Sequence, residues 1–145
     1  MILLVVRVKL RVKTRESEKD IELTVLANGG AESPRPCLAI GLSTAKELGV
    51  WPPKKAEVFS VEEASHVGNV YLIRNAVVLE LLDEKGNKLS DVEADLAIQI
   101  GLTEPLITDV TIDALGIQVI SFGKGLWRHI KDPLNVIRKS AKSYG

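Results

Sequence analysis

The chain has 145 residues, 46% of them hydrophobic and 26% charged, which is typical of a single globular domain. Its 19 basic and 19 acidic residues cancel, so no overall field would attract nucleic acid or an anionic membrane. The single cysteine, Cys37, excludes an internal disulfide and a cysteine-based metal cluster, and the two histidines, His66 and His129, lack partners at ligand spacing. We expect no metal, no cofactor, and neither nucleic acid nor membrane as a partner.

The N-terminus does not match the pattern of a secretion signal. Its purely apolar run at 1–6 is short, and no basic segment precedes it. No window approaches the ~20 apolar residues of a membrane-spanning helix. We therefore expect a cytoplasmic protein, and a lone Cys37 fits the reducing conditions there.

The first predicted elements form a hairpin. Alternating apolar and basic residues predict a strand over 6–13, and residues 21–27 predict a second strand that ends at the turn Asn28-Gly29-Gly30. The outward face of the first strand carries Arg7, Lys9, Arg11 and Lys13. Such a face is typical of a solvated strand or an edge strand protected from aggregation, and gripping a polyanion is the alternative.

The chain then alternates between short strands and one helix. A buried strand over 38–40 is expected to lead into a helix over 44–48 that Ser43 caps. Residues 57–61 predict another strand, and residues 62–69 predict an exposed loop. Cys37 has apolar neighbours and is expected to be a small core residue.

Two long strands, over 71–82 and 92–100, are expected to pair across the turn at 83–88. Strict alternation in the second strand divides its residues between two faces. The predicted inward set is Val92, Ala94, Leu96, Ile98 and Ile100, and the predicted outward set is Glu93, Asp95 and Gln99.

The last predicted elements are a brief helix over 109–115, a hairpin around 123–125 and a C-terminal helix. Asp132 followed by Pro133 is typical of a helix start, and this helix should run to about Lys142. Basic residues near its end would complement the helix dipole. The whole pattern predicts a mainly β fold, a small closed barrel with two short helices and a C-terminal helix. We place the barrel domain at 1–130 and the basic helix or tail at 131–145.

Three segments share their order and spacing with retropepsin-like aspartic proteases. They are "VLANGGAE" at 25–32, "LSTAKELGV" at 42–50 and "EPLITDVTIDALGIQV" at 104–119. In that family an apolar strand ends in Asp-Thr/Ser-Gly-Ala, a helix resembling A-x-E-L-G-L follows, and an apolar-apolar-Gly turn later opens a second short helix. The chain resembles this layout over 21–128. The resemblance implies an acid-protease barrel that forms a homodimer.

Two positions depart from the family pattern. Asn28 stands at the catalytic aspartate, and Thr108 stands at the glycine of the second signature, where the backbone passes close behind the catalytic turn. An aspartic protease shares one proton between two carboxylates, and in this family each chain of the dimer supplies one. Two Asn28 amides would supply no general base. The resemblance therefore implies that the standard mechanism is lost.

The candidate site is a peptide-binding turn with no catalytic residue, and it comprises Asn28, Gly29, Gly30, Ala31 and Glu32. From its residues alone, the turn is one that tolerates positive φ. The resemblance places an acidic peptide-contacting residue at Glu32, for which a solvated loop carboxylate is the alternative. It also places a flap over the groove at 65–68. Asp109 is expected to cap or charge the start of its helix.

Our leading hypothesis is an inactive retropepsin-like homodimer that binds a peptide or a protein partner. One alternative is an active endopeptidase whose acid is Asp109 or a modified Asn28, because Asn-Gly sequences are prone to deamidation. Another alternative is a structural or interaction barrel without a peptide groove. Cleavage of peptides, or its absence, separates the first two hypotheses.

Overall fold

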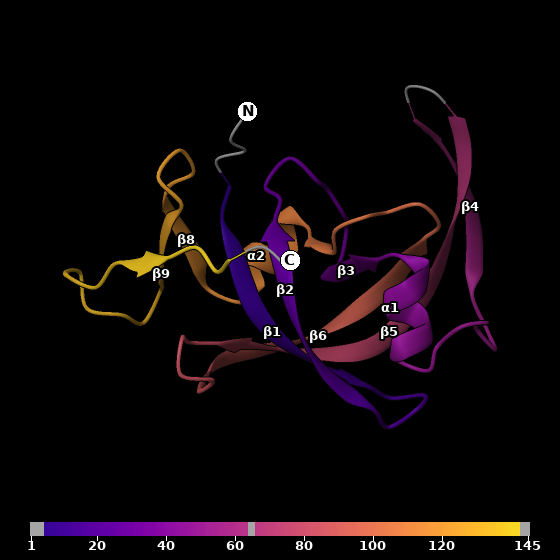
Figure 1. Ribbon diagram of the computed structural model, residues 1–145, viewed down its shortest axis with the longest axis horizontal. Helices are drawn as coiled ribbons and strands as arrows, with labels where there is room; N and C mark the ends of the chain where they lie inside the picture. Colours follow the sequence, from indigo (N-terminus) through magenta and orange to yellow (C-terminus); the bar gives the residue numbers. More distant parts are fainter. Residues whose placement is uncertain (1–4, 64–65, 143–145) are drawn as a thin grey trace.

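The computed structural model describes residues 5–63 and 66–142 (Figure 1). The described chain is mainly β, as predicted, and forms ten strands and two short helices. The strands of the first half are β1 (Arg7–Thr14), β2 (Asp20–Ala27), β3 (Cys37–Ile40), β4 (Glu57–Glu63) and β5 (His66–Leu82). Those of the second half are β6 (Lys88–Gln99), β7 (Leu106–Ile107), β8 (Ile117–Ser121), β9 (Leu126–His129) and β10 (Arg138–Lys139). The helices are α1 (Leu42–Glu47) and α2 (Asp109–Ala114).

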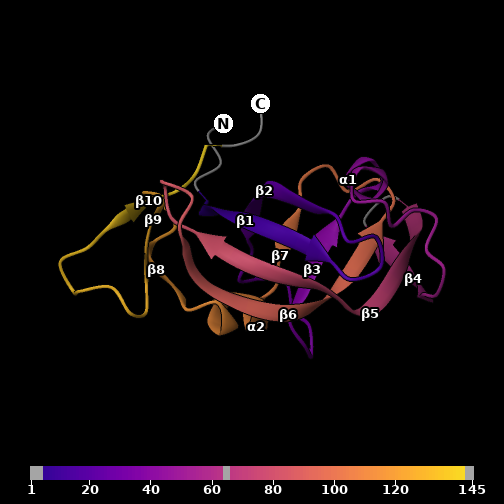
Figure 2. The same cartoon turned by 90° about the horizontal axis from the view of Figure 1, so that it is seen from below.

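Seven strands form a ring-like sheet in the order β1-β2-β7-β3-β6-β5-β4. An additional antiparallel pairing joins β1 to β5, so the hydrogen bonding returns to the first strand. Strand β4 lies outside this ring and extends β5 as a hairpin at one side of the molecule (Figure 1). The strands β8, β9 and β10 form a separate three-stranded sheet at the opposite side (Figure 2).

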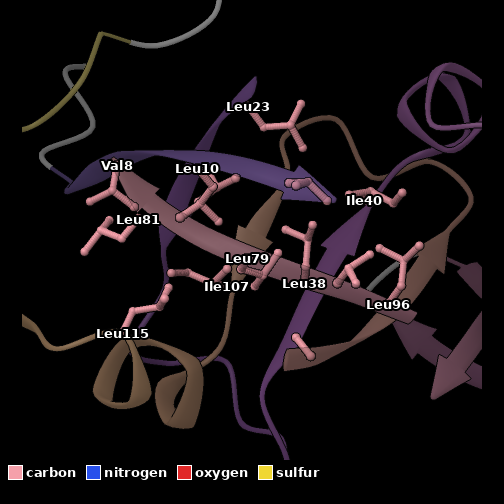
Figure 3. Packing of buried hydrophobic residues seen from close by; sticks show 14 of the residues in the cluster. Val8, Leu10, Leu23, Leu38, Ile40, Leu79, Leu81, Leu96, Ile107 and Leu115 are labelled. Carbon is pink, nitrogen blue, oxygen red and sulfur yellow. The ribbon is translucent and has the colours of Figure 1, made fainter. Parts of the chain in front are cut away.

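The ring encloses the core because its strands alternate between apolar and polar residues. In β1 every second residue is buried, beginning with Val8, Leu10 and Val12. Figure 3 shows Val8 and Leu10 meeting apolar residues of distant segments. The labelled core residues are Val8, Leu10, Leu23, Leu38, Ile40, Leu79, Leu81, Leu96, Ile107 and Leu115. Each such side chain contributes roughly 1.5–3 kcal/mol when it leaves water.

The basic face of β1 is not an edge, which corrects the edge-strand prediction. Strand β1 pairs with β2 on one side and with β5 on the other. Three of its four cations are neutralised by acidic neighbours: Arg7 by Glu104, Arg11 by Glu22 and Glu80, and Lys13 by Glu80. The face is therefore an ion-pair network on a strand inside the sheet. Of the four cations of β1, Lys9 alone has no acidic partner among the described residues.

Strand β5 pairs with three strands: with β6 over most of its length, with β4 over its first part and with β1 over its second part, and a bulge lies between these two parts. Its pairing with β6 shifts register between Ile73 and Val77, and Asn75 there has a φ of 50°. The carboxylate of Asp95, on β6, accepts the Asn75 N–H at 2.8 Å. Asp95 is therefore buried, with 4% of its surface exposed, although alternation placed it outside. Ile100 was predicted to point inward, and this prediction is wrong, because Ile100 lies beyond the end of β6 and is 40% exposed.

The predicted loop at 62–69 is instead part of the β4–β5 hairpin. Residues 62, 63 and 66–69 belong to its strands, and residues 64–65 lie outside the described chain. The local sequence offers few turn residues before Gly68, while pairing with β5 satisfies the backbone of β4. Near the base of the hairpin, Arg74 donates to both carboxylate oxygens of Glu57, at 2.7 and 3.0 Å.

Both short helices form close to their predicted positions. Helix α1 is capped by Gly41, not by Ser43. A Cβ at position 41 would lie 2.3 Å from the carbonyl oxygen of Leu102, so the close approach of that backbone requires glycine there. Helix α2 starts after Thr108 and has Asp109 in its first turn, which agrees with the expected charge at a helix N-terminus.

The predicted C-terminal helix is absent from residues 131–142. These residues, which we call the C-terminal strap, contain turns followed by the short strand β10, paired with β9. The carboxylate of Asp132 does not cap a helix, because it accepts hydrogen bonds from the His129 N–H and from the Arg138 guanidinium, each at 2.8 Å. Arg138 also lies over the ring of Trp127, 5.7 Å from its centroid. These tertiary contacts outweigh the local helix signal.

Candidate functional site

The Asn28 turn is held against the segment that precedes helix α2. Strand β2 runs parallel to β7, which pairs Ala27 with Ile107. Just beyond this pair, the Asn28 N–H donates to the Ile107 carbonyl at 3.1 Å, and the Asp109 N–H donates to the Ala31 carbonyl at 2.9 Å. Two segments that are far apart in the chain therefore form one junction, because parallel pairing brings their ends to the same place.

The turn itself has ordinary backbone angles, which corrects the prediction from its residues. Asn28, Gly29 and Gly30 are not among the described residues with positive φ. The turn is closed by a hydrogen bond from the Ala31 N–H to the Asn28 carbonyl at 3.0 Å. The Asn28 side-chain oxygen accepts the Gly30 N–H at 3.1 Å. Left-handed geometry therefore does not explain the glycines of this turn.

A cavity of about 400 Å³ opens at the turn. Its lining residues are Val5, Leu26, Ala27, Asn28, Gly29, Gly30 and Phe122. A Cβ added to Gly29 would meet only the Phe122 ring, at 3.9 Å, so the glycines leave the cavity floor open. Three predicted site residues, Asn28, Gly29 and Gly30, are thus together at the cavity. Ala31 and Glu32 do not line it, and Glu32 is exposed on the loop that follows.

Thr108 is buried, and its side chain belongs to a chain of hydroxyl groups, not to the cavity. Its Oγ1 lies 2.6 Å from the Ser33 hydroxyl and 2.7 Å from the Thr111 hydroxyl. Thr111 Oγ1 in turn accepts the Cys37 N–H at 2.8 Å. Hydrogen bonds therefore satisfy the Thr108 hydroxyl, which stands where the family has a glycine. They also tie the start of helix α2 to Ser33, in the loop between β2 and β3, and to Cys37, at the start of β3.

Asp109 is engaged at the start of helix α2. Its Oδ1 accepts the Val110 N–H at 2.7 Å and the Ser33 N–H at 3.3 Å. The residues that line the Asn28 cavity include no carboxylate. The cavity thus offers an amide that can donate and accept hydrogen bonds, backbone groups and apolar surface, but no general base.

The remaining reactive side chains of the described chain are structural. Cys37 is buried, and this burial, aided by the nearby Asp95 carboxylate, raises the pKa of its thiol to about 11, so it is not a nucleophile at neutral pH. His129 is buried, and its Nε2 lies 3.1 Å from the Leu115 carbonyl oxygen. The structure does not describe the side chain of His66. The described residues contain no group of three His, Cys, Asp or Glu side chains that could hold a metal.

Residues 66–68, at which the resemblance places a flap, belong to strand β5 of the β4–β5 hairpin. In Figure 1 it rises beside the ring, and the loop that contains Asn28 and the turn between β8 and β9 reach the same edge of the molecule. Val58 and Phe59 of β4 are 56% and 46% exposed. The first residue of the predicted flap, residue 65, lies outside the described chain. The described part is an extended hairpin with apolar side chains on its surface.

Four lining residues of the cavity were not among the predicted site residues: Leu26 and Ala27, which directly precede the turn, and Val5 and Phe122, which are distant from it in the chain. Phe122 is 48% exposed at the tip of the β8–β9 hairpin and lies close to Gly29. Its signal was an aromatic residue directly before the Gly-Lys-Gly turn, where turn positions are usually polar. Its contact with residue 29 depends on how the two sheets pack, and that packing leaves no local sequence pattern.

A scan against protein-family models finds no match for this chain, and a search of curated proteins finds no significant similarity. Neither helix of the described chain is long and apolar enough to span a membrane. The functional assignment therefore depends on the geometry of the Asn28 junction and on the resemblance carried by the three sequence segments.

Proposed function

We propose that this chain is a retropepsin-like protein that has lost peptidase chemistry and binds an extended peptide segment as a homodimer. The observation that carries the proposal is the junction at Asn28. Two backbone hydrogen bonds, from Asn28 to Ile107 and from Asp109 to Ala31, join the two segments that resemble family signatures. An amide stands at the cavity where the resemblance expects a carboxylate.

The loss of chemistry follows from the groups at the turn. Peptide hydrolysis by paired carboxylates needs one that is charged, to take a proton from water, and one that is protonated, to polarise the carbonyl. A symmetric dimer would instead supply two Asn28 amides. Asp109 would be a poor substitute, because its carboxylate is hydrogen-bonded to the Val110 and Ser33 N–H groups outside the cavity.

Peptide binding is supported by what the site retains. An amide can donate to a peptide carbonyl and accept from a peptide N–H, and Phe122 and Leu26 give the cavity an apolar wall. Strand β4 ends the seven-stranded sheet, so its outer edge offers backbone groups to an extended segment. A second copy is implied because one chain supplies half of such a groove.

The decisive experiment compares the natural chain with Asn28→Asp. Both are incubated with a diverse peptide pool from acidic to neutral pH, and cleavage is followed by mass spectrometry. We expect no cleavage by the natural chain and cleavage by Asn28→Asp at least about 10²-fold above it, because acid–base catalysis is restored. A transition-state peptide inhibitor should block that cleavage.

Asn135→Asp is the matched control, since it makes the same chemical change at an exposed strap residue. Peptide mass spectrometry of each sample checks that Asn28 itself is unmodified. Inhibitor-sensitive cleavage by the natural chain would overturn the inactive assignment. Failure of Asn28→Asp to cleave, together with failure of the natural chain to retain any peptide from the pool, would favour a barrel without a peptide groove.

A further inference from the structure

A larger cavity, of about 700 Å³, lies under the C-terminal strap. It is bounded by the start of β1, the end of β5 with the turn that follows, and the strap itself. Figure 2 shows the end of β5 and this turn beside β9 and β10. The strap cavity shares no lining residue with the Asn28 cavity, so it is a separate feature of the molecule.

The walls of the strap cavity are fixed by hydrogen bonds that tie the strap to β1 and to the β8–β9 turn. The Ala141 N–H donates to the Arg7 carbonyl and the Ser140 N–H donates to the Gly125 carbonyl, both at 2.7 Å. The Arg7 N–H donates to the Ser140 hydroxyl, also at 2.7 Å. The cavity is therefore preformed, and a ligand would not have to order the strap when it binds.

The lining divides into an apolar body and a cationic rim. The apolar lining residues are Val8, Leu82, Trp127, Val136, Ile137 and Ala141. Leu82 and Trp127 are buried, whereas Ile137 is 58% exposed at the mouth. The cationic lining residues are Arg7, Lys9, Arg138, Lys139 and Lys142. A site with one apolar side and one charged side matches a ligand of the same two-part character.

The free charge of the rim comes from three lysines. In the part of the chain that the structure describes, no acidic side chain pairs with Lys9, Lys139 or Lys142. Arg7 is paired with Glu104, and Arg138 is paired with Asp132 and Glu84.

The cavity's two carboxylates do not offset these lysines directly. Asp83 accepts the Lys85 and Asn87 N–H groups of its own turn, at 2.9 and 2.8 Å, and these bonds lower the pKa of its carboxyl. Glu84 accepts from the Arg138 guanidinium at 3.2 Å. Lys9, Lys139 and Lys142 are consequently available to an external anion.

We infer that the strap cavity binds a small amphipathic anion, a carboxylate or phosphate group joined to an apolar body. The apolar body would lie against Trp127 and Val136, and the anionic group would lie at Lys9 and Lys139. The volume is within the range of about 300–1,000 Å³ that small-molecule sites have. This site is independent of the function proposed for the Asn28 turn, because either can fail without the other.

The test uses 8-anilinonaphthalene-1-sulfonate, an aromatic anion that fluoresces in apolar surroundings, as the probe. We expect one saturable site per chain, with quenching of Trp127 fluorescence in a Trp51→Phe background. Decanoate, decyl phosphate and AMP are then added as competitors. Displacement by the first two points to an acyl-chain ligand, and displacement by AMP points to a nucleotide-like one, and either outcome supports the site.

Variants of the lining residues test whether the probe binds in the strap cavity. Lys9→Glu combined with Lys139→Glu should weaken probe binding by about tenfold or more, because two attractive charges at the anion become repulsive ones. Val136→Trp should block the cavity. The matched control, Lys54→Glu with Lys55→Glu, makes the same charge change at two exposed lysines that do not line the cavity and should bind as the natural chain does.

Circular dichroism and thermal unfolding check that each variant folds, and Lys→Gln versions replace any charge reversal that does not. Many weak equivalent sites, affinity that is equal in the rim and control variants, or no saturable binding at all would overturn the inference. None of these outcomes bears on peptide cleavage by Asn28→Asp, so the two proposals fail separately.

Discussion

Thr111 is the residue that links helix α2 to the loop after the Asn28 turn. Its hydroxyl is buried and bonds the Cys37 N–H, the Cys37 carbonyl and the Thr108 hydroxyl. Thr111→Val keeps the shape of the side chain but leaves the buried Cys37 N–H without its acceptor. We expect the free energy of unfolding to fall by about 1–3 kcal/mol, measured by urea denaturation.

Thr103→Val is the matched control, because Thr103 is exposed and its hydroxyl bonds to no described residue. That variant should unfold within about 0.5 kcal/mol of the natural chain. Equal stability of the two variants would show that the hydroxyl chain does not hold helix α2 to the loop.

The alternation of apolar and polar residues in β6 gave a wrong prediction of burial for single residues. Asp95 lies on the predicted outward face of β6, yet it is buried because the β5 bulge turns the Asn75 N–H toward it. The same face carries Ala97, which packs with Cys37 and Ala39 in a second small core cluster. A period of two predicts which residues share a face. It does not predict whether a neighbouring segment covers that face.

The C-terminal strap is the element whose structure differs most from its prediction. Asp132-Pro133 favours the start of a helix locally. In the folded chain, contacts with residues that are distant in the sequence outweigh this preference. Arg138 combines a two-oxygen ion pair with Asp132 and a cation–π contact with Trp127. A helix over these residues would lose the β10 pairing that lets both contacts form.

This arrangement predicts a pH dependence for the strap. Hydrogen bonds from Arg138, opposed by burial, lower the pKa of Asp132 to about 2. A carboxyl whose folded pKa is depressed stabilises the fold above its unfolded pKa of about 4, and this contribution is lost as the pH falls from about 4 to about 2. Asp132→Asn should lower the free energy of unfolding by roughly 1–2 kcal/mol at neutral pH. The difference from the natural chain should shrink over that acidic range.

Asp91→Asn is the control for this prediction, because it removes a surface ion pair with Lys88 in which both side chains are half exposed. Its effect should stay below about 1 kcal/mol. Urea denaturation at a series of pH values measures all three proteins. A difference for Asp132→Asn that does not change between neutral pH and pH 2 would refute the assigned role of the ion pair.

At the scale of the whole molecule, the exposed apolar residues gather at one side. Of the eight large apolar residues that are exposed in the described chain, five lie within residues 120–137, and Phe122 borders the Asn28 cavity. An exposed apolar surface beside a half-site is typical of a protein interface. The homodimer proposed here would bury Phe122, since a two-fold axis near Asn28 would pass close to its ring, which lies 3.9 Å from a Cβ built at Gly29.

We therefore expect sedimentation equilibrium to show a dimer that Phe122→Asp weakens by roughly 2 kcal/mol or more, the loss typical of a central interface residue. Ile100→Asp is the matched control. Ile100 is similarly exposed but lies at the end of β6 that pairs toward Ile40, away from the Ile107 end where Asn28 is bound. A monomer at all concentrations, or equal weakening by both variants, would contradict the proposed interface.

The mainly β class and most strands followed from the sequence. Alternation of apolar and polar residues is a local property. Val8, Leu10 and Val12 therefore indicate a half-buried strand before the strands that pair with it are known. The two short helices were likewise predicted near their positions, because apolar spacing and the glycines that end them are contained within a few residues.

Tertiary structure decided the properties that depend on residues far apart in the chain. It determined that β1 lies inside a ring-like sheet, that Asp95 is buried, that the C-terminal segment is a strap, and that Phe122 adjoins Gly29. The local sequence pattern determines whether a segment forms a strand or a helix. Which strands pair, whether the outer face of a strand is covered and where cavities form depend on contacts between residues far apart in the chain. The sequence by itself therefore determined most of the strands and the amide at Asn28, and only the folded chain determined what surrounds that amide.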